Sequence, residues 1–144
     1  MIDATADPLI TRAVPAPDPI TDFFWASGAD GCLRILRCAD CGLLVHPPSL
    51  PCPQCLSPQL NPIVVSGAGV VVTFTVNVQP WTTDQEPYVI AVVELAEQSG
   101  LRLTTNIVGC APEDVRIGQA VQVSFIARNG LHYPVFTPDG GTHP

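Results

Sequence analysis

Two Cys-x-x-Cys pairs restrict what this chain can fold into more than any other feature of its sequence. Cys38 and Cys41 form the first pair, Cys52 and Cys55 form the second, and ten residues separate the pairs. Two residues between cysteines let one tight turn direct both sulfurs at a single point, and two such turns joined by a hairpin complete a tetrahedron. The spacing therefore predicts one metal ion held by these four cysteines in a small ribbon.

The chemistry of four thiolates narrows the kind of metal site. Zinc accepts a tetrahedron of sulfurs without a geometric preference of its own, so we predict structural zinc. Iron is the alternative, because thiolate tetrahedra also hold iron. Four protein ligands leave no open position for a substrate, so a catalytic metal is not expected. Two disulfides or free thiols are the remaining interpretation of the same cysteines.

The other reactive side chains carry no recognisable catalytic pattern. Cys32 and Cys110 lie outside the metal motif, and we interpret Cys110 as a small buried apolar residue at the end of a strand. A nucleophilic cysteine needs a histidine partner, and His46, His132 and His143 form no known signature with it. The sequence predicts no catalytic residue, and hence a chain that is not an enzyme by itself.

The charge balance disfavours nucleic acid as a partner. The 144 residues include thirteen acidic side chains and six basic ones, giving a formal net charge of −7. All six basic residues are scattered arginines, whereas proteins that bind nucleic-acid phosphates carry a basic patch.

No membrane or targeting segment is expected either. The chain begins without a basic or apolar leader, and its longest purely apolar run, around residues 89–93, is far too short to span a bilayer. We therefore expect a cytoplasmic protein, in which paired cysteines more often bind metal than form disulfides.

The region before the cysteines predicts a short aromatic helix. Asp18 is a good N-cap, Pro19 suits the first helical position, and Gly28 can end the helix in the left-handed conformation. A helix of about nine residues is not stable alone in water, so it must dock. Phe23, Phe24 and Trp25 cannot all face one way, because consecutive helical side chains point about 100° apart. One face is thus expected to pack on this chain and the other to meet a partner.

Beyond the cysteines, apolar and polar residues alternate with the period of β-strands. Residues 88–95 are apolar on both faces as far as Glu94, so we expect this strand to be covered on both sides. Five strands in about 75 residues fit a five-stranded, partly open barrel of the OB type, whereas a sandwich would need about seven. The predicted strands lie near residues 72–78, 88–95, 101–107, 121–125 and 133–136.

These elements divide the chain into five parts, and the fold class is mainly β. The parts are a flexible tail (residues 1–18), a docking helix (19–29), a zinc ribbon (30–59), an OB-fold (60–138) and a second flexible tail (139–144). The candidate partner interface comprises the helix aromatics and the apolar strand: Phe23, Phe24, Trp25, Tyr88, Ile90 and Val92.

An ordered set of motifs resembles a known family. The motifs are Phe24-Trp25, Gly31-Cys32-Leu33, Arg37-Cys38-Ala-Asp-Cys41-Gly42, Pro47-Pro48, Cys52-Pro-Gln-Cys55, residues 69–80, residues 87–95, Asn106-Ile107-Val108-Gly109-Cys110 and residues 112–118. The set resembles acyl-CoA-associated proteins built from a rubredoxin-like zinc ribbon and an OB-fold, long catalogued as a domain of unknown function. The resemblance covers about residues 19–138.

The resemblance implies an accessory role in a hetero-oligomeric complex. Members of this family associate with thiolase-fold enzymes or with hot-dog-fold hydratases that act on acyl-CoA thioesters. Several accompany a lipid-transfer-protein-like thiolase homologue that cleaves steroid side-chain CoA esters by retro-aldol chemistry. It follows that the partner would hold most of the acyl-CoA substrate.

One departure from the family pattern bears on CoA binding. Ser49 and Leu50 stand where the family often has an arginine after the two prolines, which weakens the expectation that this chain binds CoA directly. The alternatives are a CoA-binding scaffold for a thiolase, synthase or enoyl-CoA hydratase and, more remotely, a nucleic-acid-binding ribbon and barrel.

Overall fold

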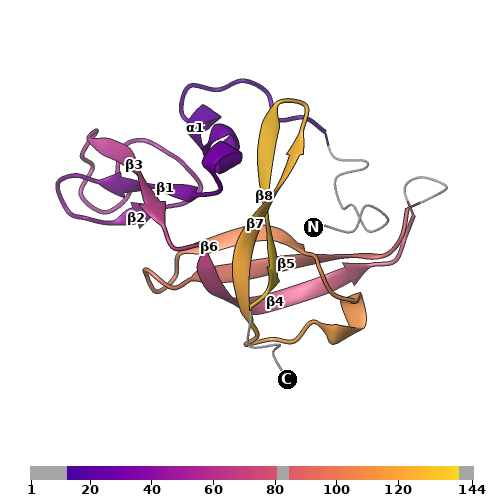
Figure 1. The fold of residues 1–144 in the computed structure, drawn as a ribbon. Coiled ribbons are helices and arrows are strands. Elements are labelled where there is room, and N and C mark those ends of the chain that lie inside the picture. Colours follow the sequence, from indigo (N-terminus) through magenta and orange to yellow (C-terminus); the bar gives the residue numbers. More distant parts are fainter. Residues whose placement is uncertain (1–12, 81–84, 140–144) are drawn as a thin grey trace.

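The computed structural model describes residues 13–80 and 85–139, which form a small three-stranded sheet, a short helical segment and a five-stranded barrel (Figure 1). The N-terminal elements are α1 (Asp22–Ala26), the 3₁₀ helix η2 (Ser27–Asp30), β1 (Leu33–Cys38), β2 (Leu44–Val45) and β3 (Leu60–Val65). The barrel elements are β4 (Ala68–Asn77), β5 (Tyr88–Leu95), β6 (Arg102–Ile107), the 3₁₀ helix η3 (Pro112–Asp114), β7 (Ala120–Arg128) and β8 (Leu131–Pro138).

The ribbon sheet has the antiparallel order β2-β1-β3 and carries the cysteine loops at one end. Residues 60–65, which the sequence places in the barrel, instead form β3 and pair with β1 from Leu33↔Val65 to Cys38↔Leu60. Pro62 makes this strand hard to predict from the sequence, because proline has no backbone N–H to donate to the hydrogen-bond ladder of a central strand. β3 tolerates it because β3 is an edge strand of the sheet.

The five remaining strands close into a barrel in the order β4-β5-β6-β8-β7. This confirms the mainly β fold with a ribbon followed by a five-stranded barrel, although the barrel is closed and not partly open. Closure follows from β4, which is ten residues long and pairs with β5 along its length and with β7 near its start. The pairing register of β4 with β5 shifts by one residue between Val71 and Thr73, as it does at a β-bulge.

Strand β5 is half covered on its outer face. Val89, Ala91, Val93 and Leu95 are buried in the barrel, whereas the residues between them are only partly buried. We expected this strand to be covered on both faces. Among the described residues, only its inner face is fully covered.

The aromatic helix begins and ends differently from the prediction. Asp18 makes the hydrogen bonds of an N-cap, because its carboxylate accepts the N–H of Ile20 and its carbonyl accepts the N–H of Asp22. The residues after it form a turn, and the assigned helix α1 begins only at Asp22. The helical segment continues as η2 and ends at Gly31, which has φ of +82°, so Gly28 does not provide the left-handed ending.

Gly28 allows the backbone of η2 to approach the barrel closely. A Cβ at this position would lie 2.2 Å from Cδ1 of Phe125 on β7, so only glycine lets η2 lie against that ring. The short helical segment thus docks on this chain's own barrel, as the instability of an isolated helix of this length requires.

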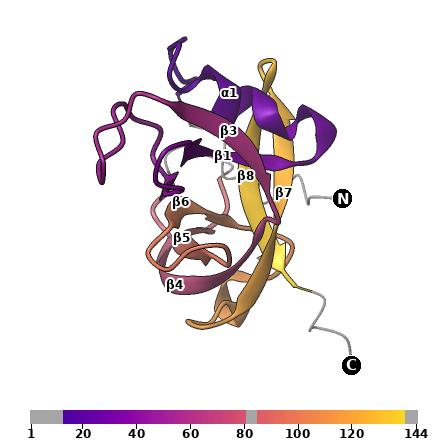
Figure 2. The ribbon, with the colours of Figure 1, turned by 90° about the vertical axis from the view of Figure 1, so that its left-hand side faces the viewer.

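Ribbon, helix and barrel share one hydrophobic core. The buried cluster joins Phe24 of α1, Leu33 and Ile35 of β1, and Val121 and Phe136 of the barrel. Figure 2 shows α1 and the ribbon at one end of the molecule, β4–β6 at the other, and β7 and β8 running between them. The ribbon and barrel are therefore packed as a unit.

The two predicted flexible tails lie mostly outside the residues that the structure describes. Most of the predicted N-terminal tail (residues 1–12) and of the C-terminal tail (residues 140–144, with His143) lies outside the described residues. Within the described ranges, no helix combines the length and apolar character that crossing a membrane requires.

Candidate metal centre and its surroundings

The four predicted ligands converge on one point. The sulfurs of Cys38, Cys41, Cys52 and Cys55 all lie within 4.8 Å of one another. The Sγ atoms of Cys38 and Cys55 are 3.6 Å apart, as are those of Cys41 and Cys52. With Zn–S bonds of about 2.3 Å, a regular tetrahedron needs sulfurs about 3.8 Å apart. The cluster therefore has the geometry of a site for one structural metal ion.

The two cysteine turns repeat the same hydrogen bonds. Gly42 donates its N–H to the carbonyl of Cys38, and Leu56 donates its N–H to the carbonyl of Cys52, both at 2.9 Å. These two donors occupy equivalent positions, directly after the second cysteine of each pair. Gly42 has φ of +81° and Leu56 has φ of +64°. Each turn therefore needs a left-handed residue at this point.

Leu56 is the unusual member of that pair. A left-handed backbone costs a non-glycine residue about 1–2 kcal/mol, and the Leu56 side chain is 71% exposed, so it gains little burial in this chain. Sequence reasoning missed this position, and the signal that could have found it is its alignment with Gly42 in the second Cys-x-x-Cys repeat.

The turns also favour the thiolate form of the two buried sulfurs. Backbone N–H groups of Cys41 and Asp40 lower the pKa of the Cys38 thiol to about 6, although desolvation opposes them. N–H groups of Cys55 and Gln54 likewise lower the pKa of Cys52, and the Gln54 nitrogen lies 3.4 Å from its sulfur. Metal ligation requires thiolates, so the backbone prepares these two sulfurs for it.

The pKa of the Cys55 thiol is raised, whereas those of Cys38 and Cys52 are lowered. The Ser57 N–H lowers its pKa, but desolvation and the neighbouring sulfurs outweigh this and raise the pKa to about 12. Four adjacent thiolates repel one another, and a cation at their centre removes that penalty. The donor set thus fits a divalent metal ion.

A side-chain hydrogen bond ties the two turns together. The hydroxyl of Ser57, which is buried, donates to the carboxylate of Asp40 in the first turn. Ser57 also accepts the N–H of Gln59 at 3.0 Å and, through its carbonyl, the N–H of Cys52 at 2.9 Å. The relative position of the turns therefore does not depend on the metal alone.

The predicted interface aromatics pack on this chain. Phe24 is 6% exposed, and Phe23 and Trp25 are partly buried against the core. The Trp25 ring lies 5.6 Å from that of Tyr133 on β8, and the Phe24 ring lies 5.0 Å from that of His46 in the ribbon. These three aromatics thus join helix, ribbon and barrel, and their contact with a partner stays a prediction.

The other half of the predicted interface lies elsewhere on the barrel. Tyr88, Ile90 and Val92 are half-buried on the outer face of β5, next to exposed Thr73 and Thr75 of β4. No charged residue belongs to this group of side chains, but their role in binding a partner also stays a prediction.

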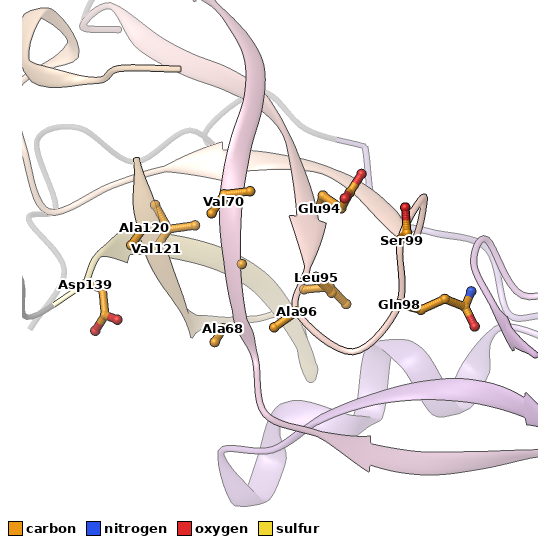
Figure 3. Close-up of a pocket in the computed structure, with 11 residues that line it drawn as sticks. Ala68, Val70, Glu94, Leu95, Ala96, Gln98, Ser99, Ala120, Val121 and Asp139 are labelled. Carbon is orange, nitrogen blue, oxygen red and sulfur yellow. The ribbon is translucent and has the colours of Figure 1, made fainter. Parts of the chain in front are cut away.

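A shallow groove of about 410 Å³ crosses the outer surface of the barrel (Figure 3). Its lining includes small residues: Ala68 on β4, Ala120 on β7 and Ala96 in the turn after β5. Its charged lining residues are Glu94 and Asp139, and no arginine or histidine lines it. The groove is therefore poorly suited to the phosphates of CoA.

Comparison with known proteins identifies the family. The protein-family model of the ChsH2 rubredoxin-like zinc ribbon domain matches residues 25–61 of this chain. The family model of the ChsH2 C-terminal OB-fold domain matches residues 63–125. The chain belongs to the ChsH2 family. The two matched domains correspond to the ribbon and the barrel described above.

Two curated relatives are larger than this ChsH2-family chain. It is 38% identical to the probable enoyl-CoA hydratase alpha subunit of Thermomonospora curvata, over 91% of this chain and 41% of that protein. It is 39% identical to the 3-oxo-4,17-pregnadiene-20-carboxyl-CoA hydratase alpha subunit of Mycobacterium tuberculosis, over 78% of this chain and 35% of that protein. The chain thus spans roughly two fifths or less of these relatives.

A solved structure matches almost end to end. A chain of a structure described as the Ltp2–ChsH2(DUF35) aldolase superposes with a TM-score of 0.78 at 37% identity, covering 87% of this chain and 98% of that one. The ChsH2 fold is thus found as a separate chain in an aldolase assembly, and as part of longer hydratase subunits.

Proposed function

We propose that this chain is a non-catalytic accessory subunit of an acyl-CoA-processing complex, in which it binds a thiolase-fold enzyme of the lipid-transfer-protein-like class. The partner would be a retro-aldolase, a carbon–carbon lyase acting on steroid side-chain CoA thioesters. The observation that carries the proposal is the 98% coverage of a separate ChsH2(DUF35) chain from an Ltp2 aldolase. That match includes the ribbon and the barrel together, which supports a role like that of the ChsH2(DUF35) chain.

The chemistry of the described residues agrees with a non-catalytic role. The metal centre offers four sulfurs and no open coordination position. Burial, and then the charge of Asp114, raise the pKa of Cys110, so this thiol is not activated as a nucleophile. The carbon–carbon bond cleavage would therefore occur on the partner.

The partner is also proposed to hold the acyl-CoA. Arg34 is paired with Asp30, Arg102 with Glu94, and Arg116 donates to backbone carbonyls. These arginines are already engaged, and among the described residues the only charged side chains that line the groove are those of Glu94 and Asp139. A chain with a net charge of −7 is a poor primary site for the phosphates of CoA.

A steroid acyl group is supported by one relative. The Mycobacterium tuberculosis protein is named for a 3-oxo-4,17-pregnadiene-20-carboxyl-CoA, a steroid thioester. We extend that substrate class to the complex of this chain, with the partner enzyme providing the steroid pocket.

The metal is proposed to be zinc in a structural role. Zinc has no redox chemistry and accepts four thiolates, and it would hold the two cysteine turns in one fixed arrangement. Elemental analysis of the purified chain should show about one zinc per chain. Iron in place of zinc would be visible as colour and would correct this part of the proposal.

Co-purification tests the partner. A tagged copy of this chain is co-expressed with an Ltp2-type thiolase-fold protein from the same genome, and the eluate is examined by gel filtration. We expect a stable complex and retro-aldol cleavage of a steroid side-chain CoA thioester that neither chain shows alone. Free migration of both chains would refute the proposal.

A hydratase partner is the second candidate, because two of the curated relatives are named as hydratase alpha subunits. In those proteins the matched region is joined to sequence that this chain does not match. Parallel co-expression with a hot-dog-fold hydratase subunit distinguishes the candidates. Binding of that subunit and not the thiolase-fold protein would move the assignment to a hydratase complex.

A further inference from the structure

The four cysteine residues of the metal centre differ in exposure. Cys38 and Cys52, the first cysteines of the two turns, have exposed fractions of 0%. Cys41 and Cys55, the second cysteines, are exposed at the surface. Each turn therefore contributes one buried cysteine and one cysteine at the surface.

The close sulfur contacts join the two turns. Exposed Cys41 is 3.6 Å from buried Cys52, and exposed Cys55 is 3.6 Å from buried Cys38. The hydrogen bond from Ser57 to Asp40 holds the turns in this register. The sulfur of each exposed cysteine thus lies 3.6 Å from the sulfur of a buried cysteine of the opposite turn.

We propose that the metal centre is a peroxide-sensitive switch, in which the exposed cysteine of one turn is oxidised and then forms a disulfide with the buried cysteine of the other turn, releasing the ion. The expected bonds are Cys41–Cys52 and Cys38–Cys55. This property belongs to the isolated chain and does not depend on the identity of its enzyme partner.

The reaction balances with one peroxide for each disulfide. The Cys41 thiolate attacks hydrogen peroxide, an S–O bond forms, the O–O bond breaks and hydroxide leaves, giving a sulfenic acid. The Cys52 thiolate then attacks that sulfur, the S–S bond forms, the S–O bond breaks and a second hydroxide leaves. Two thiolates lose two electrons, peroxide gains them, and two protons convert the hydroxides to water.

Loss of the ion follows from the loss of thiolates. Thiolate, not disulfide, is the metal ligand, so one disulfide removes two of the four ligands. Cys38 is the last residue of β1 and pairs with Leu60 of β3. Rearrangement at the sulfurs therefore acts directly on the end of the ribbon sheet.

Metal release and disulfide mapping test the proposal on the full zinc-loaded chain. Hydrogen peroxide is added in steps, zinc is followed with a chromogenic chelator, and remaining thiols are alkylated before peptide mass spectrometry. We expect one zinc released per chain, disulfides between the turns as the early products, and recovery of the bound metal after a thiol reductant and zinc are added.

A matched variant separates the ligands from the other cysteines. The double substitution Cys32→Ser with Cys110→Ser leaves all four ligands in place and should release zinc at the same rate as the natural chain. Predominant Cys38–Cys41 and Cys52–Cys55 bonds would overturn the proposal. So would retention of zinc with intact ligand thiols at a peroxide concentration that oxidises free cysteine in the same buffer.

Discussion

The side-chain amide of Gln98 hydrogen-bonds both backbone groups of Leu44. Leu44 donates its N–H to Oε1 of Gln98 and accepts from Nε2, each at 2.9 Å. Leu44 lies on β2, an outer strand of the ribbon sheet, and Gln98 lies in the turn between β5 and β6 of the barrel. One side chain thus occupies the place of a neighbouring strand and fastens the ribbon edge to the barrel.

Replacing Gln98 by alanine should loosen this connection. Gln98→Ala removes both hydrogen bonds and leaves the partly buried backbone of Leu44 without them, which costs about 1–3 kcal/mol of unfolding free energy. Urea unfolding of the metal-loaded chain measures the loss, and hydrogen exchange of the Leu44 amide should become faster. Ser99→Ala, at the next and exposed position, serves as the control and should change neither quantity.

Removing a ligand sulfur should remove the metal. Cys52→Ser replaces a buried thiolate by a hydroxyl that zinc binds poorly, so we expect metal content to fall from about one per chain to well below half, with loss of ribbon stability. Elemental analysis and thermal unfolding measure the two effects. Cys110→Ser, outside the cluster, should retain the full metal content; an equal loss in both variants would contradict the assignment of ligands.

The strained position in the second cysteine turn should respond to glycine. Leu56→Gly relieves the left-handed strain and should stabilise the metal-loaded chain by up to about 1 kcal/mol, less the greater freedom of glycine in the unfolded chain. Gly42→Ala at the equivalent position introduces that strain and should destabilise by about 1 kcal/mol. Opposite signs in chemical unfolding are the expected result, and equal signs would contradict the equivalence of the two turns.

The contact between Gly28 and Phe125 offers a double-mutant test. Gly28→Ala places a methyl group where the ring already lies, and overpacking of this kind costs about 1–3 kcal/mol. Phe125→Leu should recover part of that loss when the two substitutions are combined. Strict additivity of the two unfolding free energies would show that η2 does not press on this ring.

Stability should fall in mild acid partly because of His46. Burial lowers the pKa of His46 to about 4, below the usual value of about 6.5 in an unfolded chain. Between these values the unfolded chain binds more protons, so unfolding becomes easier as the pH falls. From pH 7 to 5.5 this group should reduce the unfolding free energy by about 1 kcal/mol.

The variant His46→Phe isolates that contribution. It keeps a ring against Phe24 but cannot take up a proton, so the natural chain should lose about 1 kcal/mol more than the variant between pH 7 and 5.5. Protonation of the metal ligands affects both proteins alike when zinc is in excess. Identical pH dependence of the two would show that His46 takes up its proton without unfolding.

The four converging cysteines and most barrel strands could be predicted because their signals are local. Two residues between cysteines are enough to bring Cys38 near Cys41, and alternation within a strand shows which side chains face a core. The convergence of the two cysteine pairs then follows from a short hairpin. These features depend on neighbours in the sequence and on little else.

What could not be predicted depends on contacts between distant segments. Glycine is the residue type that commonly ends a helix, and on that basis the sequence suggests such a role for Gly28. In the structure, glycine is required at this position because the ring of Phe125, nearly a hundred residues away, leaves no room for a side chain. Pro62 concealed β3, whose pairing with β1 is permitted by its position at the sheet edge. No periodicity marks Gln98 as a bridge to Leu44, because a single side chain makes the connection.

The shared core has a consequence for how such a protein evolves. The ribbon contributes Leu33, Ile35 and Val65 to the same buried cluster as the barrel, so separating the two would expose apolar surface on both. Gene rearrangements that move only one of the two regions would yield two damaged products. Recombination should therefore transfer the ribbon and the barrel together. We expect fusion to a larger enzyme to be tolerated at the ends of this unit and not at the junction between ribbon and barrel.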